Sequence, residues 1–387
     1  MITTWKWRGG KKAFLCAAAL APMLNEIAIA EEADSTSQRG QSVRERARPE
    51  YDAAGLRAGS FLVFPSINFS AATNDNIYAI SSPETDDIIL STEPSMLIRS
   101  TWSRHLFTLQ AGGKIERYVD TTSENNNEFY SKANAELDLR DNTQLKGSIY
   151  YGSLTESRSN NSVDDGNGAL LTAEPITYEL IDAEAGISHT INRVRLSASY
   201  NISSYDYNDQ QLLSGGNSDQ DVRDHDISEY QAQADLAISP DTSLFVRGAI
   251  TKWDYDLAPP DAPFNRDSDG FEIAGGANFK LGRIANGEIF VGYQERSFDD
   301  PRFKKNEALD YGAAVYWYLS ELTSVTLYAE SNINPSTVDN ASSFLRQSAY
   351  ITVDHELLRN VLLQGRFLYG RDKFDDVARI DEWASGR

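Results

Sequence analysis

The stretch VRLSASYNIS, residues 194–203, alternates apolar and polar residues without a break. Val194, Leu196, Ala198, Tyr200 and Ile202 form the apolar set, and every residue between them is polar or charged. Because successive side chains of a β-strand point to opposite faces, this period of two predicts a strand with one apolar and one polar face.

The same alternation recurs from Phe61 onward, for example in 133–140, 232–238, 271–281 and 325–333. Short turn sequences alternate with longer polar connections, so each strand meets a turn at one end and a loop at the other. We count 15 strands between Phe61 and Phe374, or about 21 residues per strand and connection. The predicted tight turns are 102–104, 140–142, 191–193, 239–241, 285–287, 320–322 and 358–360, and the predicted long loops are 74–86, 120–128, 155–175, 207–225, 256–269, 297–307 and 334–345.

The first 30 residues have the layout of an export signal. Four basic residues between Lys6 and Lys12 precede an apolar stretch at 13–24, and Ala28-Ile29-Ala30 is a small-x-small cleavage site. We therefore predict that 1–30 is a cleaved signal peptide. Cys16, the only cysteine, lies inside it, so disulfides and cysteine chemistry are excluded from the mature chain. Residues 31–58 are polar, show no apolar period and are predicted to be a solvated periplasmic leader.

Two all-β architectures fit the repeated alternation. A soluble sandwich or propeller would bury the apolar faces in a core, whereas a transmembrane barrel would turn them toward lipid. The export signal and the segregation of turns from loops favour the membrane. Aromatic residues near the loop ends are predicted to form a belt at headgroup level: Tyr78, Tyr118, Tyr130, Tyr151, Tyr178, Tyr205, Tyr230, Trp253, Tyr255, Tyr311, Tyr350 and Tyr369. We predict a transmembrane antiparallel β-barrel of about 16 strands (16–18) over residues 59–387.

The end of the chain breaks the pattern. Residues 377–387 begin a sixteenth strand through Ile380 and Trp383, but a spanning strand takes ~9–11 residues. Barrels of this class have even strand numbers, short periplasmic turns and longer outer loops. We therefore expect the barrel to be C-terminally incomplete, with one to three strands missing; the alternative is closure on a short last strand.

Three segments near the start of the barrel resemble the putative beta-barrel porin 2 family. They are 48–52 (RPEYD), 55–65 (GLRAGSFLVFP) and 75–78 (DNIY), and the turn at 100–105 (STWSRH) is similar as well. The resemblance covers essentially the whole mature chain, and its motifs are structural. It implies an outer-membrane barrel of a Gram-negative bacterium with links to exopolysaccharide production or export.

Signs of catalysis or cofactor binding are sparse. The net charge of −21 opposes binding to nucleic acid. His105, His189, His225 and His355 show no metal-binding spacing. The first three lie beside predicted turns or a loop and are predicted to be solvated. The acidic clusters 164–168 and 219–221 could ligate a divalent cation, but flexible loops explain them more simply. We therefore expect no enzyme activity, no cofactor and no metal.

The charges on the predicted lumen face are the remaining candidates for function. Such residues either set ion selectivity or pair across strands to stabilise the wall. Because both signs occur, strong selectivity is not predicted. The candidates are Lys114, Glu116, Lys132, Glu136, Asp138, Lys146, Arg195, Asp235, Arg247, Glu272, Lys280, Glu330 and Arg366.

We expect a porin-like channel for exopolysaccharide export or passive solute diffusion. The alternative is a non-conducting barrel whose extracellular loops bind surface polymer. Outer-membrane lipid, exopolysaccharide and polysaccharide-export components are the expected partners, and the oligomeric state is left open.

Overall fold

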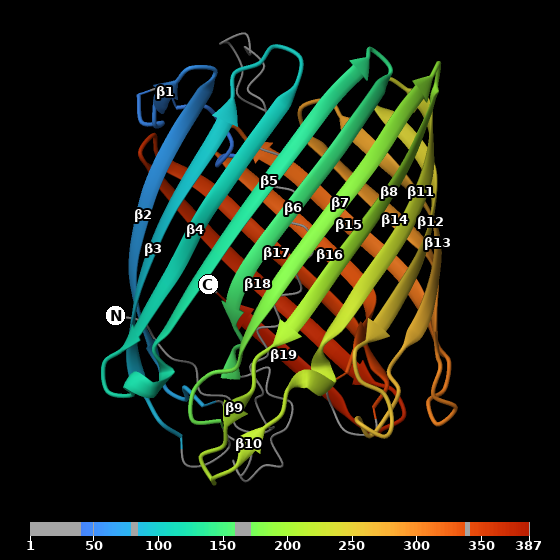
Figure 1. Cartoon of the computed structure of the whole chain (residues 1–387). Coiled ribbons are helices and arrows are strands. Elements are labelled where there is room, and N and C mark those ends of the chain that lie inside the picture. The colour runs from blue at the N-terminus through green and yellow to red at the C-terminus, as the bar shows by residue number, and fades with distance from the viewer. Residues whose placement is uncertain (1–39, 49, 79–83, 159–171, 337–340, 387) are drawn as a thin grey trace.

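The computed structural model describes residues 40–48, 50–78, 84–158, 172–336 and 341–386. Long tilted strands dominate these residues (Figure 1). The predicted signal peptide, 1–30, lies outside the described residues. The elements are β1 Leu56–Ala58, β2 Phe61–Asn74, β3 Asp87–Ser100, β4 Leu106–Tyr118, η1 Thr122–Glu124, β5 Asn126–Arg140, β6 Thr143–Thr155, β7 Thr177–Ile191, β8 Val194–Tyr207, β9 Gln210–Gln211, β10 Asn217–Ser218, η3 Asp221–Arg223, β11 His225–Ser239, β12 Thr242–Tyr255, β13 Ser268–Leu281, β14 Ala285–Phe298, β15 Asn306–Ser320, β16 Thr323–Pro335, β17 Ser343–Leu358, β18 Val361–Phe374 and β19 Ile380–Gly386.

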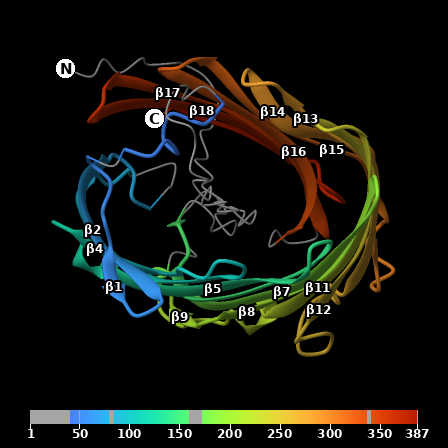
Figure 2. The same cartoon turned by 90° about the horizontal axis from the view of Figure 1, so that it is seen from above.

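Each long strand pairs antiparallel with the next one in the chain, and β8 pairs with β11 across the small β9–β10 hairpin. Seen from above, the strands curve into a ring (Figure 2). The all-β, antiparallel barrel fold is therefore confirmed. The 15 strands predicted between Phe61 and Phe374 are β2–β8 and β11–β18, and β19 is the short sixteenth.

The two ends of the ring differ as the sequence predicts. Tight turns lie at the upper end in Figure 1, where β1 also lies, and the long connections lie at the lower end beside β9 and β10. One predicted turn is misplaced: residues 282–284 join β13 to β14, and 285–287 already belong to β14. Gly282 adopts a positive φ of 54° there, which glycine does without steric cost.

The strand register separates an outer and an inner face. Side chains on a convex face spread apart, so large apolar residues remain exposed there, such as Leu196 (47%) and Val246 (59%). Side chains on the concave face converge, so polar residues become buried there, such as Gln294 (2%) and Asp310 (7%). Following register partners from strand to strand gives one consistent inner set around the ring.

Glycines on the inner face make room for aromatic rings from neighbouring strands. A Cβ on Gly276 would collide with the ring of Phe245, and a Cβ on Gly112 would collide with Tyr130. Covering of strand glycines by aromatic rings is a known way to support curved sheets.

The ring has a seam between its first and last strands. β19 pairs with Phe367–Lys373 of β18, and no registered pairing joins β19 to β2 in the described residues. At the turn end, β1 pairs with Phe61–Val63 of β2, with Leu56 opposite Val63. Among the described ranges, no helix has the length and apolar character to cross a membrane.

The prediction of a wholly solvated leader is wrong for residues 40–48, whereas residues 50–58 are largely exposed as predicted. Val43 is fully buried and Arg46 is 3% exposed, because residues 40–48 pack against the barrel near its turns. The backbone N–H of Val43 donates to Ser324 Oγ at 3.1 Å. This contact spans 281 residues of sequence, so no local pattern could indicate it.

Candidate functional site: the inner wall of the barrel

The 13 predicted lumen charges all occupy inner positions of the strand ladder. The strand register therefore places all 13 side chains on one face. Their role in a pore stays a prediction. They are Lys114 and Glu116 on β4, Lys132, Glu136 and Asp138 on β5, Lys146 on β6, Arg195 on β8, Asp235 on β11, Arg247 on β12, Glu272 and Lys280 on β13, Glu330 on β16 and Arg366 on β18.

Some of these predicted residues lie together, and others stand apart. Lys114 Nζ lies 2.7 Å from Glu116 Oε1, and Lys146 Nζ lies 3.2 Å from Glu136 Oε1. The Arg366 guanidinium instead lies 4.2 Å from the centre of the Tyr350 ring. The first pair lies within β4 and the second joins β6 to β5, so cross-strand pairing accounts for Lys146 and Glu136, as the alternative interpretation proposed.

Arg247 is the centre of the largest polar cluster on this wall. Its Nη2 lies 2.7 Å from Glu288 Oε1 on β14, so the pair crosses the inner face of β13. Its Nε donates to Gln233 Oε1 on β11 at 2.7 Å. The Phe245 and Phe290 rings lie 4.8 and 5.3 Å from its guanidinium carbon. Arg247 thus links three strands through charge, hydrogen bonds and ring contacts.

A second arginine lies nearby against an indole. The guanidinium carbon of Arg296 lies 3.4 Å from the centre of the Trp253 ring, and its Nη1 donates to Ser268 Oγ at 3.2 Å. Arg296 is 4% exposed and Trp253 is equally buried. Trp253 thus lies on the inner wall and not in the predicted outer belt, and Arg296 is a wall residue outside the predicted set.

The register adds many charges that the sequence analysis missed, and most of them are acidic. Counting every inner position of β2–β8 and β11–β19 gives 18 carboxylates against 10 cations, and Arg57 of β1, opposite Leu62, adds one more cation. The carboxylates are Asp87, Glu93, Glu116, Glu128, Glu136, Asp138, Asp182, Glu184, Glu229, Asp235, Glu272, Glu288, Asp310, Glu330, Asp354, Glu356, Asp372 and Asp381; the cations are Arg99, Lys114, Lys132, Lys146, Arg195, Arg247, Lys280, Arg296, Arg346 and Arg366. Extending each alternation to the strand ends would have found them.

The predicted aromatic belt is largely wrong. Only Tyr151, Tyr230, Tyr311 and Tyr369 of the twelve lie on the outer face of described strands, and Tyr78 lies in a loop. The other seven point inward: Tyr118, Tyr130, Tyr178, Tyr205, Trp253, Tyr255 and Tyr350.

Several of these inward rings stack at the loop end of the wall. Tyr178 stacks on Tyr207 with ring centroids 5.1 Å apart, and His225 lies between Tyr205 (4.7 Å) and Tyr255 (4.9 Å). His225 is only 7% exposed, which corrects the prediction that it is solvated. The stack rigidifies the wall where β7, β8, β11 and β12 enter the loops.

The loops beyond this stack are tied by one buried and one part-buried ion pair. Arg158 binds both carboxylate oxygens of Glu124 at 2.8 and 2.6 Å, and Arg223 does the same to Glu156 at 3.0 and 2.6 Å. Next to Arg223, burial raises the pKa of Asp224 to about 6, against the hydrogen bond that it accepts from the Tyr207 N–H.

The structure brings Asp209 beside Asp219 and Asp221 of the predicted acidic cluster. Their carboxylates lie within 4.8 Å of one another, and all three are exposed. Exposed carboxylates in a loop are common without an ion, so this arrangement alone assigns no metal. The other cluster, 164–168, lies outside the described residues.

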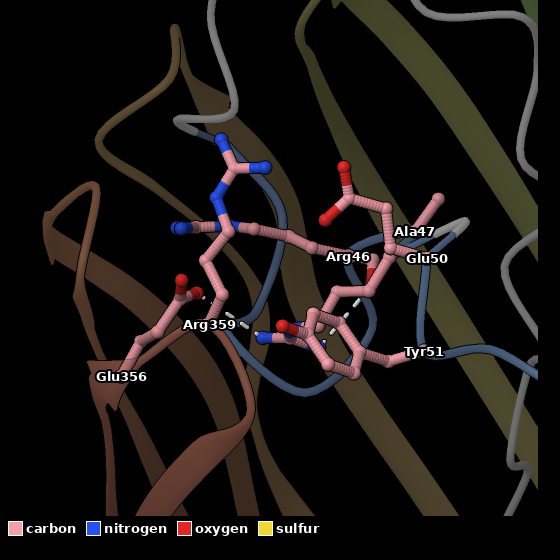
Figure 3. A pocket seen from close by; sticks show the side chains of 7 residues that line it. Arg46, Ala47, Glu50, Tyr51, Glu356 and Arg359 are labelled. Carbon is pink, nitrogen blue, oxygen red and sulfur yellow. Dashed lines mark hydrogen bonds and ion pairs between the residues drawn. The ribbon is translucent and has the colours of Figure 1, made fainter.

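A pocket of about 160 Å³ lies at the turn end, between residues 46–48, 50 and 51 on one side and Glu356 and Arg359 on the other (Figure 3). Arg48 Nη2 lies 3.2 Å from Glu356 Oε2, and Arg46 and Arg359 complete its cationic lining. Burial lowers the pKa of Arg46 against the opposing charge of Glu356.

Comparison with known proteins identifies one family. The family described as putative beta-barrel porin 2 matches residues 48–387. A search of curated proteins finds no match.

Among solved structures, the chain is similar to the siderophore receptor PiuA from Acinetobacter baumannii, with 11% identity and a TM-score of 0.44 over 81% of this chain and 60% of that one. It is also similar to the ferric-catecholate import receptor Fiu from E. coli K12, with 10% identity and a TM-score of 0.42 over 87% and 66% of the two chains. The chain thus spans less than two thirds of the length of these receptors.

Proposed function

This chain belongs to the putative beta-barrel porin 2 family, and on this premise we propose that it is an outer-membrane channel whose acidic lumen favours cations and uncharged solutes over anions. The surplus of inner-wall carboxylates carries the proposal, because rings of Asp and Glu create a potential that attracts cations. The sequence-based expectation of weak selectivity rested on 13 residues in which the two signs nearly balance.

The same wall chemistry bears on polymer export. Inward hydroxyls, amides and carboxylates can hydrogen-bond a hydrated glycan, while the net negative charge opposes an acidic one. We therefore propose an uncharged or amine-bearing exopolysaccharide as the polymer substrate, with passive diffusion of small solutes as the other use. Lipid would cover the outer apolar face, and polysaccharide-export components are the partners to test. No residue is assigned a catalytic or cofactor-binding role.

Ion selectivity in a planar bilayer tests the channel. Under a KCl gradient, the wild-type protein is expected to show a reversal potential with the sign of cation preference. Glu184 is an exposed inner residue of β7, and Glu184→Lys is expected to move that potential toward zero. Glu179 lies on the outer face of the same strand, so Glu179→Lys is the matched control and is expected to leave the potential unchanged.

Two outcomes would contradict this proposal in different ways. Anion preference in the wild-type protein would overturn the role of the carboxylates. Absence of conductance at every voltage would favour the non-conducting barrel whose loops bind polymer. Neighbouring genes for glycosyltransferases and polysaccharide export would favour export over general diffusion.

The orientation of the barrel is tested on intact cells. Barrels of this class place short turns in the periplasm and long loops outside. An epitope inserted between Gly215 and Gly216, in the exposed β9–β10 turn, is expected to bind antibody on intact cells. An epitope at Asn142, in the β5–β6 turn, is expected to bind only after permeabilisation, and the reverse result would invert the topology.

A further inference from the structure

Residues 40–58 form a strap at the turn end of the barrel. Figure 2 shows this dark-blue segment inside the ring, running from the vicinity of β17 and β18 toward β1 and β2. At its start, Gly40 lies against Arg283 in the β13–β14 turn. Next, the Arg46 Nη1 donates to the carbonyl oxygen of Glu321 in the β15–β16 turn. The strap therefore contacts successive turns of the barrel.

The wall groups that hold the strap all belong to the inner face. Ser324 and Asp354 are register partners on β16 and β17, and Glu356 lies two residues further on the same face of β17. Ser324 Oγ accepts the Val43 N–H. A strap bound to these groups must lie inside the ring, where it occupies part of the turn-end mouth.

Two arginines of the strap face two carboxylates of the wall. Arg48 Nη2 lies 3.2 Å from Glu356 Oε2, with the side chains 13% and 11% exposed. Arg44 Nε lies 3.8 Å from Asp354 Oδ1, with Arg44 mostly exposed. The first pair is shielded and the second is open to solvent, so the Arg48–Glu356 pair contributes more to holding the strap.

The far end of the strap is fixed to the other side of the seam. Its last residues, β1, pair with β2, and Gly55 adopts a φ of +73° directly over the Phe64 ring. A Cβ at this position would lie 2.7 Å from that ring. The strap thus reaches from β17 to β2, and its β1 end is held by backbone pairing.

The end of the strap that lies against β17, residues 40–48, is held mainly by polar contacts. Val43 is the one large apolar side chain of residues 40–48 that is buried, and the pocket of about 160 Å³ separates residues 46–48, 50 and 51 from Glu356 and Arg359 (Figure 3). A segment with few buried apolar contacts opens locally at low cost in free energy. Polar contacts, and above all the two ion pairs, therefore hold this end.

We propose that residues 40–48 are an ionic latch that narrows the turn-end mouth, and that breaking the Arg44–Asp354 and Arg48–Glu356 pairs lets the latch swing out about its β1 hinge. The proposal rests on the proposed channel function. In this proposal, Asp354 and Glu356 hold the latch against the wall. Their position in the lumen wall does not by itself require that role.

A double variant releases the latch, and a cross-link restores it. Asp354→Asn with Glu356→Gln removes both charges of the catch, and single-channel conductance is expected to rise roughly 1.5-fold as the mouth widens. Adding Val43→Cys and Ser324→Cys in a Cys16→Ser background allows a disulfide between strap and wall. Oxidation is expected to abolish the increase and reduction to restore it, which separates strap movement from the change in mouth charge.

The control disulfide lies within the wall. Ser66 and Ser95 are register partners on β2 and β3, with their Oγ atoms 2.7 Å apart, so Ser66→Cys with Ser95→Cys should form a disulfide that leaves the release unaffected. Failure of the strap cross-link where the wall cross-link forms would overturn the placement of the strap. If the variant that carries the strap cysteines and both charge removals conducts equally when oxidised and when reduced, the latch is contradicted and the channel is not. Absence of conductance in every variant would instead contradict the proposed channel function, and the latch with it.

Discussion

Replacing Asp372 with alanine is expected to lower the free energy of unfolding by about 3–5 kcal/mol, the largest effect that a single substitution in this barrel should have. Arg346 Nε and Nη2 bind the two oxygens of Asp372 at 2.8 and 2.7 Å, and the side chains are 6% and 1% exposed. Without the carboxylate, the Arg346 guanidinium would remain buried and uncompensated. Urea titration of the barrel in lipid vesicles, followed by its heat-modifiable gel mobility, measures the loss.

A paired substitution separates the cost of a lone charge from the value of the pair. Arg346→Met with Asp372→Leu removes both charges together, and replacement of a buried pair by apolar residues is often neutral. The double variant is therefore expected to recover most of the stability that Asp372→Ala loses. A loss below about 1 kcal/mol for Asp372→Ala would show that water reaches Arg346.

Placing an arginine on the outer face is expected to destabilise the barrel nearly as much as Asp372→Ala does. Ile149 lies near the middle of β6, is 53% exposed, and faces outward between Ala133 and Ala183. Arginine at the bilayer midplane costs about 2–4 kcal/mol in barrels of this kind. Ile149→Arg is expected to reduce the amount of folded protein in outer membranes and to lower its urea midpoint by a corresponding amount.

The neighbouring residue provides the control for face. Ser148 precedes Ile149 and points into the ring, with Asn134 and Glu184 as its register partners. Ser148→Arg adds the same charge at the same depth, and because the lumen is polar its cost is expected to stay below about 1 kcal/mol. Equal losses for the two variants would contradict the assignment of an outer lipid face and an inner aqueous one.

Most of the strand layout could be predicted from the chain because each strand carries its own alternation. The 15 predicted strands are present, and the turns and loops separate to opposite ends. The sixteenth strand, predicted from residue 377, begins at Ile380. The turn predicted at 285–287 forms three residues earlier, at 282–284, where Gly282 adopts a positive φ. Gly287 belongs to β14 and lies tightly against Ala314 of β15.

The alternation in the sequence also predicts the face of the aromatic residues near the loops. Tyr130 is two residues from Lys132, and Tyr118 is two residues from Glu116, so each shares a face with a predicted lumen charge. The period of two therefore already placed these rings inside. Proximity to the loops does not indicate the face on which a ring lies, and the predicted belt is wrong for that reason.

The sequence by itself determined the strands, their two faces and their order, because these depend on neighbours one or two residues apart and on short turns. Tertiary structure alone decided which charges meet, since Arg247 reaches Glu288 across β13 and Val43 reaches Ser324 across 281 residues. Curvature of the sheet likewise decided that Gln294 and Asp310 are buried on the concave side. Side-chain alternation is a local property, whereas curvature, cross-strand pairing and the docking of the strap arise only when distant segments come together in one curved sheet.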